Sequence, residues 1–187
     1  MDSIPGEILV NHLSTFDILK LSRTSKHVSS ICQNSQTWRY LLQKDYNLRF
    51  DKSNPLRKYT KLVLIDISKT LTSVGYYYRQ IYEKIGYYNE LEIKQDETKY
   101  GVHLGTSELV AWHSSRYYEL ALGVLNFALK SDGNSIHQNN VSSEIVDLLK
   151  SYSPYPNTLL TLLIYKADIE KYQRDIINYY NDLAQRS

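Results

Sequence analysis

Apolar residues recur every seven positions near the C-terminus, and few conformations other than an α-helix satisfy such spacing. The repeated positions, each interval divided by a tyrosine, are Leu162, Tyr165, Ile169, Tyr172, Ile176, Tyr179 and Leu183. In a helix these residues form one apolar stripe, equivalent to the a and d positions of a heptad repeat. We therefore predict a helix from Asn157 to near the end of the chain.

Two roles for this stripe are left open by its pattern. It can serve as a docking or self-association surface. The candidate partner-binding residues are then Ile169, Tyr172, Ile176, Tyr179 and Leu183. Alternatively the stripe packs within its own domain, on Trp112 and Phe127, and we favour this reading because most amphipathic helices complete the core of their own domain.

Helical periodicity extends over most of the remaining chain. Beyond a polar break at residues 51–54, further helices are predicted over 55–72, 73–86, 107–130 and 142–152. The predicted fold class is all-α or mostly α. A short N-terminal helical module at residues 1–48 is followed by a helical bundle at residues 54–187.

One segment favours strands over helices. Leu91 and Ile93, and then Val102 and Leu104, alternate with polar residues on either side of residues 95–98. Alternation with a period of two is typical of half-buried strands. A small β-hairpin near residues 90–104 is therefore expected within the helical bundle.

The first forty residues show a succession of short helices. Pro5 suits the first turn of a helix, because its missing N–H is an orphan donor there and its φ is already helical. Ile8, Leu9 and Leu13 follow about one turn apart, so they share a face. Thr15 is the expected N-cap of the next helix.

This series resembles the F-box, a short helical module that docks on the Skp adaptor of a cullin-type ubiquitin ligase. The resemblance covers the Ile-Pro-Gly-Glu start at residue 4, the run from Leu13 to Lys26 and the later Trp38. It implies that the adaptor-binding residues are Ile4, Pro5, Ile8, Leu9, Leu13, Ile18, Leu19 and Trp38. The run Leu-Leu-Gln-Lys-Asp-Tyr at residues 41–46 also resembles F-box proteins of large DNA viruses.

The chain departs from the family pattern in two ways. Between Glu7 and Leu13 it is shorter by about three residues, close to one helical turn, so the apolar face stays in phase but loses contact area. Thr24 and Val28 stand where larger apolar residues are common in the family. A modest affinity for the adaptor is the expected consequence.

Candidate catalytic, metal and cofactor sites are not marked by the sequence. The five histidines form no metal-ligating pair at helical spacing, and Cys32 is the only cysteine, on the apolar side of a predicted helix. The glycines form no phosphate-binding loop. We expect a non-enzymatic protein without cofactor or metal, soluble because no apolar run approaches the length needed to cross a bilayer.

The predicted function is therefore recruitment. The F-box resemblance implies a substrate-recruiting subunit with a Skp-type adaptor and a cullin ligase as partners, while the C-terminal domain holds an unknown target. A cytoplasmic location is expected, or the cytoplasm or nucleus of the host if the source is viral. The alternative is a structural or self-associating helical protein whose F-box-like segment is only a packing module.

Nucleic-acid binding is weighed against these readings and is not favoured. Tyrosines interleave with Arg79 and Lys84 over residues 76–84, an arrangement that can hold single strands by stacking and phosphate contact. However, the formal charge is only +2, and basic residues alternate with acidic ones along the chain.

Overall fold

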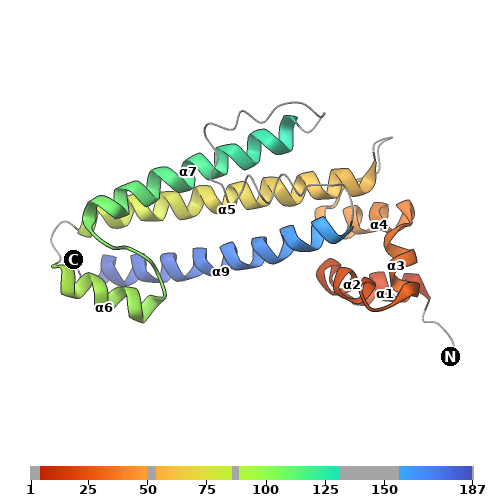
Figure 1. Cartoon of the computed structure of the whole chain (residues 1–187), viewed down its shortest axis with the longest axis horizontal. Helices are drawn as coiled ribbons and strands as arrows, with labels where there is room; N and C mark the ends of the chain where they lie inside the picture. The colour runs from red at the N-terminus through yellow and green to blue at the C-terminus, as the bar shows by residue number, and fades with distance from the viewer. Residues whose placement is uncertain (1–4, 50–53, 86–88, 131–155, 187) are drawn as a thin grey trace. The chain divides into compact units, whose positions relative to one another are not determined.

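A computed structural model describes residues 5–49, 54–85, 89–130 and 156–186. These ranges contain eight α-helices and no strand, which confirms the all-α prediction (Figure 1). The helix expected over residues 142–152 and the predicted adaptor contact Ile4 lie outside the described residues.

The chain divides into two compact units. The N-terminal unit comprises residues 1–63 and 150–164, and the C-terminal unit comprises residues 64–149 and 165–187. Two long helices, α5 (Pro55–Ile85) and α9 (Pro156–Arg186), each contribute residues to both units. The domain boundary predicted between residues 48 and 54 stays a prediction.

Four short helices begin the N-terminal unit, and polar side chains cap three of them. Their bounds are Gly6–His12 for α1, Thr15–Ser22 for α2, Lys26–Cys32 for α3 and Ser35–Tyr46 for α4. The N-cap of α2 is Ser14, whose hydroxyl accepts from the backbone N–H of Asp17, so the prediction of Thr15 as the cap was wrong by one residue. Thr15 instead turns its hydroxyl toward the carboxylate of Asp45, at 2.6 Å.

Helix α5 is a single helix of 31 residues, whereas two helices meeting near residue 72 were expected. One stripe of its buried apolar residues recurs at intervals of three and four, and its members are Leu64, Ile67, Leu71, Val74, Tyr78, Ile81 and Ile85. Thr72 and Ser73 are weak helix formers, but the stripe continues in phase across them. Burial of a continuous apolar face outweighs the local preference.

Residues 90–100 form helix α6 (Glu90–Tyr100), so the β-hairpin prediction was wrong. Asn89 and Glu92 make a reciprocal capping box at its start, and Gly101 ends it in the left-handed region with φ 65°. These local hydrogen bonds select the helix over the strand. Val102 and Leu104 follow in an extended stretch and are buried without strand pairing.

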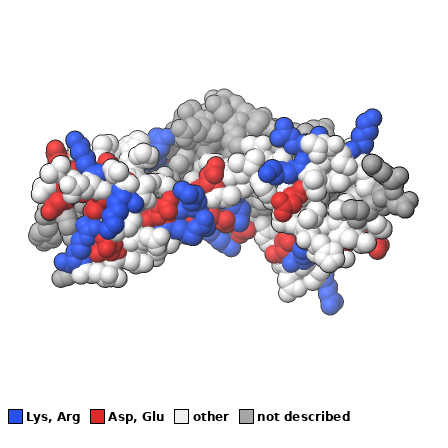
Figure 2. Space-filling model, turned by 90° about the horizontal axis from the view of Figure 1, so that it is seen from below, with Lys and Arg blue, Asp and Glu red and all other residues white. Residues whose placement is uncertain are grey.

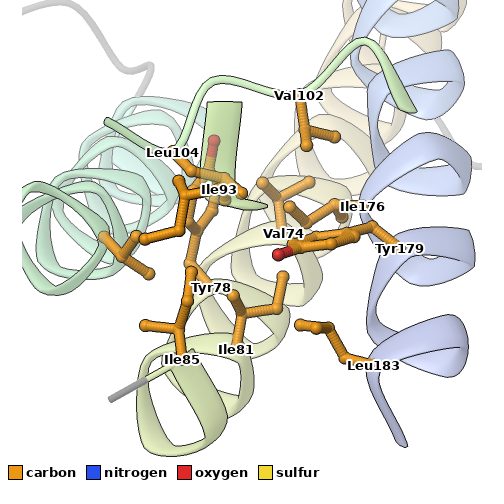
Figure 3. Close-up of a cluster of buried hydrophobic side chains, with 11 residues drawn as sticks. Val74, Tyr78, Ile81, Ile85, Ile93, Val102, Leu104, Ile176, Tyr179 and Leu183 are labelled. Carbon is orange, nitrogen blue, oxygen red and sulfur yellow. The ribbon is translucent and has the colours of Figure 1, made fainter. Parts of the chain in front are cut away.

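Helices α5, α6, α7 (Ser107–Lys130) and α9 build the core of the C-terminal unit. Figure 3 shows side chains from α5, α6 and α9 meeting beneath the extended segment of Val102 and Leu104. Helices α5 and α7 approach closely at Gly75, where an added Cβ would lie 3.2 Å from the carbonyl oxygen of Ser114. The hydroxyl of Ser114 donates to the carbonyl of Gly75 at 2.9 Å and fastens this contact.

Candidate functional site

The predicted adaptor-binding residues separate into buried and surface positions. Ile18, Leu19 and Trp38 are 1–2% exposed, so in this structure they pack the N-terminal unit and do not form its surface. Ile8 is 48% exposed, Pro5 is exposed, and Leu9 and Leu13 are half-buried. We call Pro5, Ile8, Leu9 and Leu13 the α1 face.

Trp38 anchors this unit from α4. Its indole N–H donates to the carbonyl oxygen of Cys32 at 2.7 Å, which holds the end of α3 against α4. The ring also meets the Tyr59 ring edge-on, with centroids 5.6 Å apart. Tyr59 belongs to α5, and its hydroxyl donates to Asp45 at 2.6 Å. The first turns of α5 are thus part of the support of the N-terminal helices.

Two side chains of α4 hold α1 in position. The ammonium group of Lys44 donates to the carbonyl oxygens of Val10 and Leu13, each at 2.8 Å. These carbonyls lie at the C-terminal end of α1, where a cation complements the helix dipole. The hydroxyl of Tyr40 donates to the side-chain oxygen of Asn11. The short helix is therefore held by its end, and the α1 face stays at the surface.

The cysteine of this unit, Cys32, is not in an environment that activates its thiol. Burial raises the pKa of the Cys32 thiol, although a hydrogen bond with Ser22 acts in the opposite direction. A thiol with a raised pKa is a poor nucleophile at neutral pH. An open pocket of about 220 Å³ lies beside Cys32 and Trp38, and the described residues that line it include no charged side chain.

The predicted partner-binding stripe of α9 lies largely inside the C-terminal unit. Ile176, Tyr179 and Leu183 are 0–1% exposed and belong to its core, while Ile169 and Tyr172 are half-buried. Their neighbours are the stripe of α5 and the Val102–Leu104 segment (Figure 3). Ile176, Tyr179 and Leu183 thus pack within their own unit, which is the alternative we favoured, but neither of the expected neighbours, Trp112 and Phe127, belongs to that core cluster.

A tyrosine network was not identified from the sequence. It joins Tyr78, which is buried in this core, to the half-buried Tyr117 and Tyr172 packed against the core. The hydroxyl of Tyr78 donates to the carbonyl oxygen of His103 at 2.7 Å and is also hydrogen-bonded to the hydroxyl of Tyr172. The Tyr117 ring stacks on Tyr78 at 5.4 Å between centroids. Burial raises the pKa of both Tyr78 and Tyr117, so these phenols stay neutral and act as hydrogen-bonding members of the core. The sequence signal for this network was the run Tyr76-Tyr77-Tyr78 and the pair Tyr117-Tyr118, whereas Tyr172 has no tyrosine beside it.

Charged residues on α6 and α9 are largely paired. Arg186 makes two hydrogen bonds to the carboxylate of Asp96, at 3.0 and 3.1 Å, and also contacts Asp182. Lys166 with Glu170 and Lys171 with Asp175 form further pairs along α9. Blue and red side chains accordingly lie next to each other on the face drawn in Figure 2.

The helices of the described ranges include none that is long and apolar enough to span a membrane. No protein-family model, no curated protein and no solved structure matches this chain. The functional argument therefore depends on the geometry of the two units and on the motif residues in the sequence.

Proposed function

We propose that this chain is a non-catalytic, F-box-like recruiting subunit. Its N-terminal unit binds a Skp-type adaptor of a cullin-type ubiquitin ligase, and its C-terminal unit holds a target protein for ubiquitination. Recruitment of this kind acts through proximity, because a tethered target has a high effective concentration near the ubiquitin-loaded enzyme.

The observation that carries the proposal is the exposure of the α1 face. Ile8 is 48% exposed on a seven-residue helix whose own unit buries Ile18, Leu19 and Trp38 almost completely. Pro5, at the start of this helix, is exposed as well, and Leu9 and Leu13 are half-buried, so the α1 face presents several apolar side chains together. A contiguous apolar patch of this kind is suited to a partner that covers it. The residues concerned are those on which the F-box resemblance depends.

The anchoring of α1 gives further support. Lys44 and Tyr40 hold this helix to α4, so the α1 face is ordered before any partner arrives. A preorganised surface loses less conformational entropy on binding than a mobile one. The smaller loss of entropy partly offsets the small contact area of a seven-residue helix.

The C-terminal unit offers apolar side chains for a target. Trp112, Leu122 and Leu129 of α7 are 50–59% exposed, on a helix whose other side packs on α5 through Ser114 and Ala121. Exposed tryptophan and leucine are frequent anchors of protein interfaces. The cytoplasm, or the host cytoplasm or nucleus for a viral protein, is the compartment in which this ligase function would operate.

Binding of the full chain to a purified Skp-type adaptor tests the proposal. Ile8→Asp should weaken this binding by at least tenfold, because it places a carboxylate in the apolar contact. Leu122→Asp, a matched change at a leucine of the C-terminal unit that is 59% exposed, should leave adaptor binding unchanged. Surface plasmon resonance measures both, and circular dichroism checks that each variant is folded.

One result would contradict the recruiting function, and another would contradict only the role of the α1 face. Wild-type protein that does not bind the adaptor would remove the recruiting function altogether. Equal binding by wild type and Ile8→Asp would show that adaptor contact does not use the α1 face.

The exposed side of α7 favours a second candidate, a self-associating structural protein. Leu122 and Leu129, at 59% and 55% exposure, could bury each other's surface in a dimer. Sedimentation of wild type and Leu122→Asp distinguishes the candidates. A dimer that Leu122→Asp converts to a monomer, in a protein without adaptor binding, would support self-association.

A further inference from the structure

The two units carry formal charges of opposite sign. The N-terminal unit contains eleven Lys and Arg residues and five Asp and Glu residues, which gives +6. The C-terminal unit contains eleven and fifteen, which gives −4. The chain as a whole is close to neutral at +2, and this small net charge conceals the asymmetry.

Part of the positive charge is concentrated where α2 turns into α3. Lys20, Arg23 and Lys26 lie within seven residues and are all exposed. We call these three residues the basic corner. Leu21, 40% exposed, lies among them.

The basic corner is not neutralised by carboxylates of the described ranges. Lys20 places its ammonium group over the Phe16 ring, 5.4 Å from the centroid, and no ion pair joins Lys20, Arg23 or Lys26 to a described Asp or Glu. The nearest acidic residue in sequence, Asp17, accepts the hydroxyl of Ser14 at 2.6 Å. Some cations of the C-terminal unit, such as Lys166 and Arg186, are paired with carboxylates.

We propose that the basic corner is an electrostatic docking element for an acidic protein surface, namely the surface of the adaptor that receives the α1 face. This inference rests on the proposed recruiting function and specifies the chemistry of the partner. A single-sign corner in the same unit as an apolar contact surface raises the rate of encounter with a surface of opposite charge and selects against basic partners. The apolar residues of the same unit, Ile8 and Leu21, favour a protein over a nucleic acid, because phosphates offer aliphatic side chains no counterpart.

The experiment compares association rates of the full chain with a purified Skp-type adaptor at low and high salt. The test variant carries Lys20→Glu, Arg23→Glu and Lys26→Glu together. The matched control carries Lys69→Glu, Lys94→Glu and Arg174→Glu, which make the same change in net charge at exposed positions of the C-terminal unit. A third variant with Gln at positions 20, 23 and 26 removes the charge without reversing it.

We expect the test variant to associate about tenfold more slowly than wild type at low salt, with the difference shrinking at high salt as the charges are screened. The Gln variant should fall between the two, and the control should change by less than twofold. Since the Gln variant adds no repulsion, it keeps the test decisive even if the Glu variant folds poorly by circular dichroism.

Three outcomes would overturn the inference, and they are distinguishable. If wild type binds the adaptor and the test variant binds at the same rate, the corner is not a docking element while the recruiting function stands. If wild type does not bind the adaptor at all, both fail. If the corner substitutions abolish binding of a random single-stranded DNA but not of the adaptor, the corner is a nucleic-acid site.

Discussion

The indole of Trp38 is enclosed by residues of three helices and makes both an apolar and a polar contact. It is 2% exposed, donates to the carbonyl of Cys32 and packs against Tyr59. Removing such a ring leaves a cavity and an unpaired carbonyl oxygen. Its contribution is therefore structural, and any effect on adaptor binding follows from the position of the helices around it.

The two tryptophans of the chain allow a matched test. Trp38→Ala should lower the free energy of unfolding by about 3–5 kcal/mol, the usual cost of truncating a buried aromatic residue. Trp112→Ala should cost about 1 kcal/mol or less, because that ring is 50% exposed and lies beside the guanidinium of Arg116 and the ring of His113. Urea unfolding of the full chain measures both. Equal losses would contradict the burial assigned to Trp38.

At the scale of elements, the stripes of α5 and α9 explain why long helices were favoured over shorter ones. The α5 stripe supplies a buried residue at every turn from Leu64 to Ile85. The α9 stripe is buried at Ile176, Tyr179 and Leu183, where the two stripes meet in the core of the C-terminal unit. Helix α6 has a weaker apolar face with Ile93 as its buried aliphatic residue, and its caps at Asn89 and Gly101 define it. Tertiary packing therefore stabilises α5 and α9, whereas capping hydrogen bonds stabilise α6.

The α9 stripe gives a prediction at this scale. Ile176→Asp should unfold the C-terminal unit, because the position is 0% exposed and a carboxylate there would have no partner in the apolar cluster. Asn178→Asp introduces the same carboxylate at an exposed position two residues away and should leave stability nearly unchanged. Circular dichroism melting compares them. A folded Ile176→Asp protein that loses only an association would restore the partner-surface reading.

At the scale of the whole molecule, the division into units does not coincide with a break between helices. The N-terminal unit takes in the first turns of α5, where Tyr59 meets Trp38 and Asp45. The formal charge is distributed unevenly between the units as well. Both features depend on which segments cluster in space, and neither follows from reading the chain in order.

A fragment of residues 1–48 should therefore fold poorly by itself. It lacks Tyr59 and so exposes the edge of Trp38 and leaves Asp45 without one of its donors. We expect weak helical content and no cooperative melting transition by circular dichroism, in contrast to the full chain. A cooperative transition in the isolated fragment would show that α1–α4 fold without α5, as a boundary at residue 48 implies.

Helical periodicity by itself determined the fold class, because spacing of apolar residues at three and four positions fits only a helix that buries one side. A different signal, Asn54 followed by Pro55, located the start of α5. The pattern left both roles of the α9 stripe open, and the packed core of the C-terminal unit decided between them. Reasoning from periodicity failed at residues 90–104, where a short alternating pattern also fits a helix once its caps are counted. Over so few residues, the period of the apolar positions alone does not distinguish a strand from a helix.

Tertiary structure decided which motif residues form a surface. Ile8 and Ile18 are both isoleucines in the same motif, yet one is 48% exposed and the other 1%. Their burial depends on how α1, α2 and α4 pack, and contacts such as Lys44 to Val10 join residues more than thirty positions apart. Spacing along the chain reports the side of one helix, whereas exposure depends on what the other helices leave uncovered, and that is a property of the packed unit.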